Sequence, residues 1–275
     1  MPELRSAAGE VKLGKVKGNV VLSHGDITLR DSIIDGNLYL TEGIGEGVIR
    51  LQGVQVTGTT YIRGGGGQGI SLTDSSPGAV QVAKPKGSVR IVASGTTTAG
   101  TVHLDSGVIL EEGTLTGEGF GNVVLPAGEQ IVTLIGNYGV VSTADAAGGN
   151  LMLSLSGKLS KLIWGVPGKL MLMNQAQVAE LLLTAGARGT TITGSGSFGT
   201  VLNQAEAVTA GGHRAQAGQP QQSESGLAAG QPAACCCWGR RDCDGYTGCH
   251  GDAGASSYAG ADANADQCSV ESGVE

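Results

Sequence analysis

Two consecutive stretches of equal length decide the fold: GDITLRDSIIDGNLYLTEGIGE (25–46) and GVIRLQGVQVTGTTYIRGGGGQ (47–68). Each stretch holds two short segments in which aliphatic, variable and aliphatic residues alternate. This period of two is typical of a β-strand with one buried face. Successive 11-residue units alternate in character, so the true period is 22. Glycines mark these units at Gly25, Gly36, Gly47, Gly58 and Gly69.

The same pattern continues along the chain, and Gly, Asn, Asp, Ser and Thr separate the short apolar segments. Short strands at a fixed spacing predict an all-β chain, folded as a right-handed parallel β-helix with coils of about 22 residues. Residues 18–204 then hold eight or nine coils. A hairpin sandwich is the competing fold, but it needs strands of five or more residues and Asn-Gly turns. The further apolar segments lie at residues 70–72, 80–82, 89–91, 102–104, 123–125, 131–134, 151–153 and 170–172.

One segment, QAQVAELLLTA (175–185), has the composition of a helix. Its Leu181 and Leu183 also fit the alternation of the strands. We predict a strand here.

The composition of the chain changes near residue 204. Residues 1–204 carry 14 basic and 15 acidic side chains, whereas residues 205–275 carry 3 basic and 9 acidic ones. The second part has four Val or Leu residues and no Ile, Phe or Met, too little apolar area to offset the entropy lost on folding. We therefore predict an N-terminal cap or first partial coil at 1–17, the β-helix at 18–204, and a disordered low-complexity tail at 205–275.

All the cysteines lie in that tail, and their spacing does not match the close pairs of a zinc site. The excess of Ala, Gly, Arg, Cys, Ser, Gln and His is what a GC-rich gene produces when it is read out of frame. Our hypothesis is a frameshift product; a genuine disordered linker and a metal or disulfide module are the alternatives. The cysteines are Cys235, Cys236, Cys237, Cys243, Cys249 and Cys268.

Composition also excludes several classes of protein. Glycine supplies 49 of 275 residues without a three-residue period, which excludes collagen. No run of apolar residues approaches the length of a membrane span, and the N-terminus lacks the apolar core of a secretory signal. A net charge of −7 argues against nucleic acid as a partner, because phosphates must be neutralised by Lys and Arg.

The segments GNLYLTEGIGEG (36–47), GTTYIRGGGG (58–67), SVRIVASGTTTAGTVHLDSG (88–107) and GFGNVVLPAG (119–128) resemble the repeat region of bacterial cell-surface proteins. These are the large wall proteins of Paenibacillus-like Gram-positive bacteria, many of which carry S-layer homology (SLH) domains. The resemblance is specific from about residue 18 to 125. It implies a secreted, wall-associated protein with a structural or binding role. Members usually carry a signal peptide and anchoring repeats, so the resemblance also implies that this chain is a fragment or truncated member.

Tyr39 and Tyr61 occupy the same position in the two quoted stretches, and each lies between two inward-facing residues. We therefore expect both rings to point outward and to stack one coil apart. An exposed aromatic ladder is a candidate platform for sugar binding, while the alternative is a ladder that stabilises neighbouring strands. No other ligand-binding residues are predicted.

A catalytic or metal site would need clustered side chains on the outer surface. Paired carboxylates can cleave glycosidic bonds, but Asp31/Asp35, Glu42/Glu46 and Glu111/Glu112 all lie in predicted turns without a neighbouring cluster of His, Arg and aromatic residues. We predict no catalytic residues, no metal ligands and no cofactor, although calcium at turn carboxylates stays open as an alternative.

Two G-x-G-x-x-G matches and two histidines complete the candidates. A dinucleotide site requires a helix to begin at the third glycine, whereas strand patterns follow Gly69 and Gly199. His24 and His103 lack a hydrolase motif, and we interpret them as turn and outward strand residues.

The sequence thus predicts a non-enzymatic structural or adhesive segment of an S-layer-type cell-surface protein, located at the extracellular cell wall. A carbohydrate-binding module and a polysaccharide lyase or glycosidase are the two alternatives. The expected partners are cell-wall or extracellular polysaccharide, or neighbouring surface-protein domains, without nucleic acid and without a membrane span.

Overall fold

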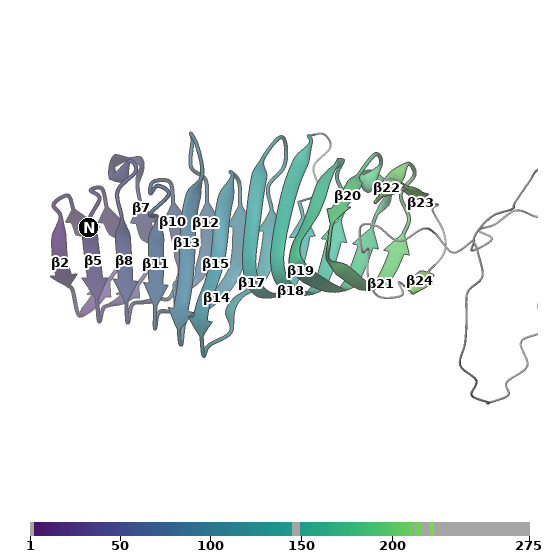
Figure 1. The fold of residues 1–275 in the computed structure, drawn as a ribbon. Coiled ribbons are helices and arrows are strands. Elements are labelled where there is room, and N and C mark those ends of the chain that lie inside the picture. The colour runs from purple at the N-terminus through teal and green to yellow at the C-terminus, as the bar shows by residue number, and fades with distance from the viewer. Residues whose placement is uncertain (1–2, 145–148, 212, 216–219, 223–275) are drawn as a thin grey trace, which may run out of the picture. The chain divides into compact units, whose positions relative to one another are not determined.

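The structure is a computed structural model, and it describes residues 3–144, 149–211, 213–215 and 220–222. These residues belong to one compact unit, Met1–Gly230. They form about ten stacked turns of a parallel β-solenoid, which confirms the predicted fold (Figure 1). The described residues contain no α-helix, and they include two 3₁₀ turns, η1 (Glu42–Ile44) and η2 (Ala185–Ala187).

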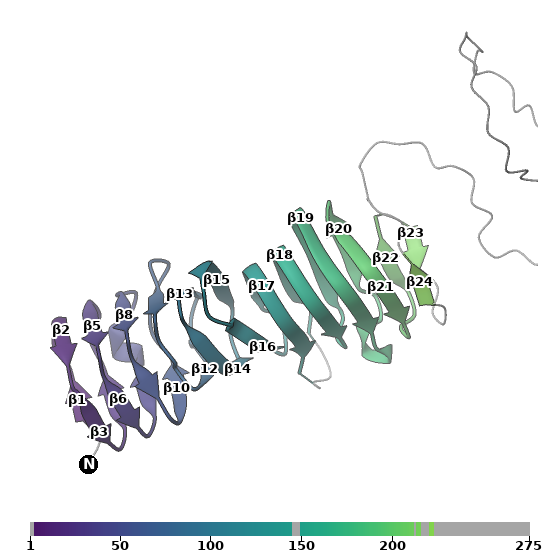
Figure 2. The ribbon, with the colours of Figure 1, turned by 90° about the horizontal axis from the view of Figure 1, so that it is seen from below.

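Two long parallel ladders make up most of the solenoid, and we name them ladder A and ladder B. They run side by side along the stack and join in the three long strands of the later coils (Figure 2). Ladder A consists of β1 (Glu3–Arg5), β4 (Val20–Leu22), β7 (Leu38–Leu40), β10 (Thr59–Ile62), β12 (Ala79–Val82), β14 (Thr98–Leu104), β16 (Gly119–Leu125) and β21 (Ser197–Asn203).

Ladder B consists of β2 (Gly9–Lys12), β5 (Ile27–Arg30), β8 (Ile49–Gln52), β11 (Ile70–Thr73), β13 (Val89–Gly95), β15 (Val108–Leu115), β20 (Thr191–Gly194) and β22 (Val208–Ala210). The strands shared by both ladders are β17 (Ile131–Thr143), β18 (Leu151–Trp164) and β19 (Gly168–Leu183). A short third ladder holds β3 (Lys15–Lys17), β6 (Ile33–Asp35) and β9 (Gln55–Val56).

The register between coils corrects the uniform period that the sequence predicts. Val20 lies opposite Leu38, and Leu38 lies opposite Thr60, so the first of these two coils is shorter than the second. Coils can differ in their number of residues because the extra residues lie in the corners between strands. The buried strand positions of neighbouring coils therefore stay opposite each other. Shorter coils, together with strands outside residues 18–204, bring the solenoid to about ten turns rather than eight or nine.

The later strands are far longer than the short segments that the alternation predicts. In β17, β18 and β19 the chain passes from ladder B to ladder A as one continuous strand of 13 to 16 residues. The register of β18 against β19 shifts between Ser156 and Lys158, which is a bulge that lets the strand turn the corner. In the segment with helical composition, 175–185, residues 175–183 belong to β19, which confirms the strand prediction for them, and Ala185 begins the 3₁₀ turn η2.

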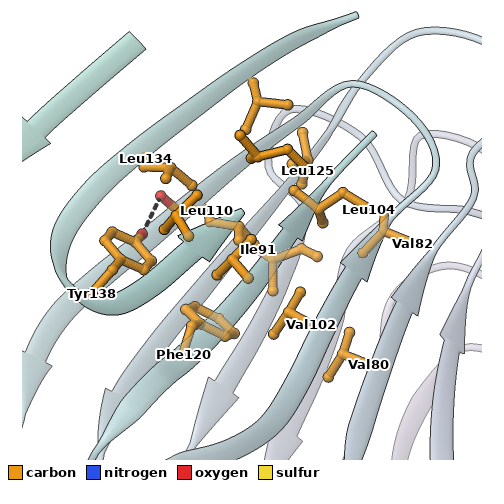
Figure 3. Close-up of a cluster of buried hydrophobic side chains, with 14 of the residues drawn as sticks. Val80, Val82, Ile91, Val102, Leu104, Leu110, Phe120, Leu125, Leu134 and Tyr138 are labelled. Carbon is orange, nitrogen blue, oxygen red and sulfur yellow. Dashed lines mark hydrogen bonds between the residues drawn. The ribbon is translucent and has the colours of Figure 1, made fainter. Parts of the chain in front are cut away.

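Alternate aliphatic side chains from every coil fill one continuous interior. Figure 3 shows part of it, where Ile91 and Val102 lie close to the ring of Phe120 and Val80 lies on the other side of Val102. Each of these side chains is buried, and full burial of such a side chain is worth about 1.5–3 kcal/mol before entropy is subtracted. No single coil could bury its own apolar face, so the coils depend on each other.

Buried hydroxyls tie the corners of neighbouring coils together. Ser32 Oγ accepts a hydrogen bond from the backbone N–H of Leu13 at 3.0 Å, and Ser75 Oγ accepts one from Val54 at 3.1 Å. These side chains satisfy backbone groups that the strands leave unpaired where the chain turns.

The two ends of the described solenoid differ. Strands β1, β2 and β3 pair parallel with the next coil, so residues 3–17 form a coil in line with the rest. At the other end the parallel ladder continues to β22, beyond residue 204. There, β23 (His213–Ala215) and β24 (Pro220–Gln222) pair antiparallel with β22 and β21. The cysteines, and with them the disorder, frameshift and metal hypotheses for the tail beyond residue 222, lie outside the described residues.

Candidate functional site

The strongest candidate site surrounds the two tyrosines on the outer face of ladder A. Tyr39 in β7 lies opposite Tyr61 in β10, and their rings stack with centroids 4.9 Å apart and planes inclined by 6°. The stack follows directly from the register, since the neighbours Leu38 and Leu40 face the interior. The predicted aromatic ladder is therefore confirmed as a structural feature.

A short asparagine ladder supports this stack. Asn37 Nδ2 donates to the hydroxyl of Tyr39 at 3.3 Å, while Asn37 Oδ1 accepts from the backbone N–H of Thr59 at 2.8 Å. In the preceding coil, Asn19 Oδ1 accepts from the N–H of Asn37 at 2.9 Å. The amide side chains thus hold the start of β7 and β10 in register beside the rings.

The stacking geometry limits what the tyrosines can present to a ligand. Because the rings are parallel and one coil apart, one face of each ring lies against the other ring. A flat platform for a row of sugars would need rings side by side in one plane. The pair instead forms a narrow aromatic wall that can contact one sugar unit.

A hollow of about 290 Å³ lies against this wall. The hollow is bounded by the two tyrosines, by the loop that follows β7, and by the side chain of Arg63, which directly follows β10. The lining residues are Tyr39, Leu40, Thr41, Glu42, Gly43, Tyr61 and Arg63.

A second hollow of about 330 Å³ adjoins the first, since Glu42 and Arg63 line both. It extends toward the corner after β12, where Lys84 and Lys86 contribute. The basic residues of both hollows were not predicted as site residues. For Arg63 a signal existed, because it follows Tyr61 by two positions and a strand places such residues on the same face. The remaining lining residues of the second hollow are Gly45, Glu46 and Pro85.

A buried lysine holds the loop that separates the hollows. The side chain of Lys84 is only 7% exposed, and its Nζ contacts Glu46 Oε1 at 2.6 Å and donates to the carbonyl of Gly65 at 2.7 Å. A third contact reaches the carbonyl of Ser88 at 3.3 Å. This clamp joins the loop after β7 to segments one and two coils further on. It restrains the loop that carries Glu42, whose 3₁₀ turn η1 projects beside β7 (Figure 1).

The glycine run at 64–67 packs against the same loop. A Cβ at Gly64 would collide with the carbonyl oxygen of Thr41, and one at Gly66 would lie too close to the backbone of Glu46. The chain after Gly69 continues as strand β11, and Gly199 lies within β21. Both G-x-G-x-x-G matches therefore lead into strands, and the first one serves close packing of backbone against backbone.

On the outer face of ladder A, polar side chains occupy the positions that follow Tyr61 in the next coils. Gln81 lies opposite Tyr61, and exposed His103 lies opposite Gln81. The amide of Gln81 donates to Asp105 Oδ2 at 2.7 Å. His24 lies in a turn, and its Nδ1 is 2.6 Å from the carbonyl oxygen of Gly25. Both histidines occupy the turn and outward strand positions predicted for them.

The prediction that the carboxylate pairs lie in turns is wrong for Asp35, which ends β6, and for Glu111 and Glu112, which lie within β15. Several of these carboxylates form contacts that tie the coils together. Asp31 Oδ2 accepts from Lys12 Nζ at 3.0 Å, and this lysine lowers the pKa of Asp31. Glu111 accepts two hydrogen bonds from the guanidinium of Arg90, at 2.6 and 3.0 Å. Among the residues that the structure describes, no three His, Cys, Asp or Glu side chains gather in a way that could hold a metal ion.

Glu112 has a different role from its neighbour. Its Oε1 and Oε2 accept hydrogen bonds from the backbone N–H groups of Phe120 and Asn137, each at 2.8 Å. Partial burial raises the pKa of Glu112, while these two hydrogen bonds act in the opposite direction. Tyr138 is buried nearby and donates to the carbonyl of Leu110 at 2.8 Å, the contact dashed in Figure 3. Burial raises the pKa of its phenol far above the usual range.

Two larger hollows, of about 440 and 450 Å³, lie along the later coils. The first is lined by Phe198 together with the polar side chains of Lys158, Gln177 and Ser197. The second contains Glu129 and Gln130 together with exposed Ile131. The first hollow thus has one aromatic ring and one lysine, and neither hollow has a stacked pair of rings beside several basic residues, so the hollows at Tyr39 and Tyr61 remain the candidate site.

Within the described part of the chain, no helix is long and apolar enough to cross a membrane. Comparison with known proteins gave no match to a family model, to a curated protein or to a solved structure.

Proposed function

We propose that the chain is a non-enzymatic structural or adhesive segment of a bacterial cell-surface protein. The observation that carries this proposal is the use of the outer charges as ties between neighbouring coils. Lys12–Asp31 at 3.0 Å and Arg30–Glu10 at 3.2 Å join two early coils. Arg90–Glu111 and Lys161–Glu180 do the same further along, at 2.6 and 2.7 Å.

Each such pair is worth at most about 1 kcal/mol, because both partners keep contact with water. Because such pairs recur along the stack, they stiffen the solenoid. They also occupy charged groups that a catalytic site would otherwise use. Two of the carboxylates considered for catalysis, Asp31 and Glu111, already serve as ties. The resemblance of residues 18–125 to wall-protein repeats supports the same role.

The location can be tested with antibodies raised against the full chain. We expect them to stain intact source cells, and brief protease treatment of those cells should remove the signal. Staining that requires permeabilised cells would overturn a surface role. An assay for reducing ends or unsaturated products from wall polysaccharides should detect no release, and release that depends on the chain would make it an enzyme.

The hollow beside Tyr39 and Tyr61 favours a second candidate function, carbohydrate binding. An aromatic wall beside Glu42 and Arg63 offers both an apolar contact and hydrogen-bonding groups, which is the combination that ligand sites use. Affinity electrophoresis against purified wall polysaccharides tests it. Retardation by a defined polymer should disappear in Tyr39→Ala/Tyr61→Ala, and unchanged retardation in that variant would exclude the site.

A further inference from the structure

The ligand class at the tyrosine hollows can be specified further, and this step rests on the carbohydrate-binding proposal. We propose that the two adjoining hollows bind an anionic sugar chain, with Arg63 pairing with its carboxylate or phosphate groups. The charges around the hollows, the position of Arg63 relative to the tyrosines and the continuity of the two hollows carry this proposal.

The charges leave an excess of positive groups facing solvent. Glu46 is paired with Lys84 at 2.6 Å, so these two charges compensate each other. Within the described residues neither Arg63 nor Lys86 forms an ion pair, and both side chains are exposed. Among the described residues that line the two hollows, only Glu42 opposes them. This excess contrasts with residues 1–204, where acidic side chains outnumber basic ones by one.

The position of Arg63 suits a sugar that carries an acid group. Tyr61 lies in β10, and Arg63 directly follows this strand, where its backbone N–H still pairs with the carbonyl of Leu40 in the preceding coil. The two residues are therefore about 7 Å apart along an extended backbone, and both line the first hollow. A pyranose ring placed with its C–H groups against the tyrosine wall carries its acidic substituent at the ring edge. A guanidinium at that distance can reach the substituent and offer two parallel N–H donors, which suits a carboxylate or phosphate.

The second hollow extends the site along a polymer. Arg63 and Glu42 line both hollows, and Lys86 lies in the second one. A chain with an acid group on successive units would meet Arg63 at the first unit and Lys86 at the next. Glu42 at the shared edge can accept hydrogen bonds from sugar hydroxyls, which are donors as well as acceptors.

Lys84 acts as a positioning residue in this arrangement. It is buried, and its three contacts engage the carboxylate of Glu46 and two backbone carbonyls rather than solvent. By clamping the loop that carries Glu42, it keeps the wall between the hollows in place before a ligand arrives. Such preorganisation lowers the entropy cost of binding.

The test uses the full chain and four polymers with different charges: oligogalacturonate, its methyl ester, poly(glycerol phosphate) and dextran. Calorimetric titration should give the tightest binding for oligogalacturonate, which combines a sugar ring with an acid group, whereas poly(glycerol phosphate) carries charge without a sugar ring. The methyl ester has the same sugars without the charge, so it isolates the contribution of the acid. Binding should weaken as salt is raised, because exposed charge pairs are screened.

The decisive variant is Arg63→Gln, and its matched control is Arg50→Gln. Arg50 is also exposed but lies on ladder B. We expect Arg63→Gln to weaken binding of the anionic polymer about tenfold and to leave the methyl ester unaffected, since a charge-assisted hydrogen bond is lost. Arg50→Gln should bind as the parent does, and circular dichroism of each variant verifies folding.

The outcomes separate the two proposals. If the methyl ester binds as tightly as the acid and only Tyr39→Ala/Tyr61→Ala abolishes binding, the chain binds carbohydrate but the anionic class is wrong. If none of the four polymers binds, carbohydrate binding and the anionic class both fall. Poly(glycerol phosphate) has no pyranose ring, so if it binds more tightly than oligogalacturonate and this binding is lost in Arg63→Gln, Arg63 recognises phosphate without a sugar on the tyrosines and the sugar-chain proposal is overturned.

Discussion

The coils of residues 20–82, which we name the early coils, and those of residues 131–183, the later coils, solve the same packing problem in different ways. Both bury alternate aliphatic side chains in one interior. Strands of the early coils have three or four residues in ladders A and B and stop at polar corners, whereas β17, β18 and β19 run through the corner without a break. Loops such as 41–47 can project only where a strand stops, and this is where the candidate site lies. The inward-facing aliphatic side chains make the coils stack. The corners between strands determine where a loop can project from the solenoid and form a binding surface.

Trp164→Ala in the later coils should give the largest loss of stability. Trp164 is fully buried, and its Nε1 donates to Thr190 Oγ1 at 3.0 Å. Removing the ring leaves a cavity between long strands that cannot collapse, at a cost of about 3–5 kcal/mol. Urea unfolding followed by circular dichroism measures it. Ile163→Ala, the outward neighbour on the same strand, is the control and should cost less than about 1 kcal/mol; equal losses would contradict the described burial.

Gly64→Ala tests the close packing of the early coils. The added Cβ would collide with the carbonyl of Thr41, and the resulting shift should cost about 1–3 kcal/mol. Gly67→Ala is the matched control, because a Cβ there meets nothing within 4 Å. Thermal unfolding of both variants makes the comparison, and the loop packing would be wrong if Gly64→Ala were as stable as Gly67→Ala.

Lys84→Met should loosen the loop at 41–47 without disturbing the later coils. The substitution removes the contacts to Glu46, Gly65 and Ser88 and leaves the buried carbonyl of Gly65 unpaired, at a cost of about 1–3 kcal/mol. Hydrogen exchange should accelerate in residues 41–47 and stay unchanged in β17–β19. Lys86→Met, an exposed neighbour, should leave exchange in both regions as it is. Uniform acceleration along the chain would show that Lys84 supports the whole stack and not the loop.

Tyr61→Leu measures the aromatic stack apart from its apolar area. Leucine keeps an apolar side chain opposite Tyr39 but removes the parallel ring, so we expect a loss of about 0.5–1.5 kcal/mol. Leu182→Ala, in the same outward row of the later coils, shows what loss of an ordinary outward side chain costs. If Tyr61→Leu has no effect on urea unfolding, the stack does not stabilise the early coils.

Glu112 lies between the two regions and should give the smallest effect, visible through pH. Burial raises its folded pKa above the ordinary value of 4.5. The folded state therefore holds the proton more tightly than the unfolded state. This contribution is fully present below pH 4.5 and is lost as pH rises through the higher folded pKa. Glu112→Gln should remove this part of the pH dependence of unfolding; an unchanged profile would show that other carboxylates cause it.

The alternation of apolar residues predicted the parallel solenoid, the inward strand positions and the Tyr39–Tyr61 stack. It did not predict coils of unequal length or strands that cross a corner. Those features depend on how bulges and hydroxyl contacts join residues that lie a whole coil apart in the chain. The clamp from Lys84 to Glu46 reaches across almost two coils, and a pattern of period two contains no signal for it.

The sequence by itself determined which side chains face inward and which face outward, because the direction of a side chain on a strand alternates with each residue. It also determined that the coils must stack, since no coil can bury its own aliphatic face. Only the tertiary structure decided that Arg63, Lys84 and Lys86 meet in the hollow that adjoins the one at the tyrosines. They come from two coils, and their meeting depends on the length of each corner and on the path of the loop at 41–47.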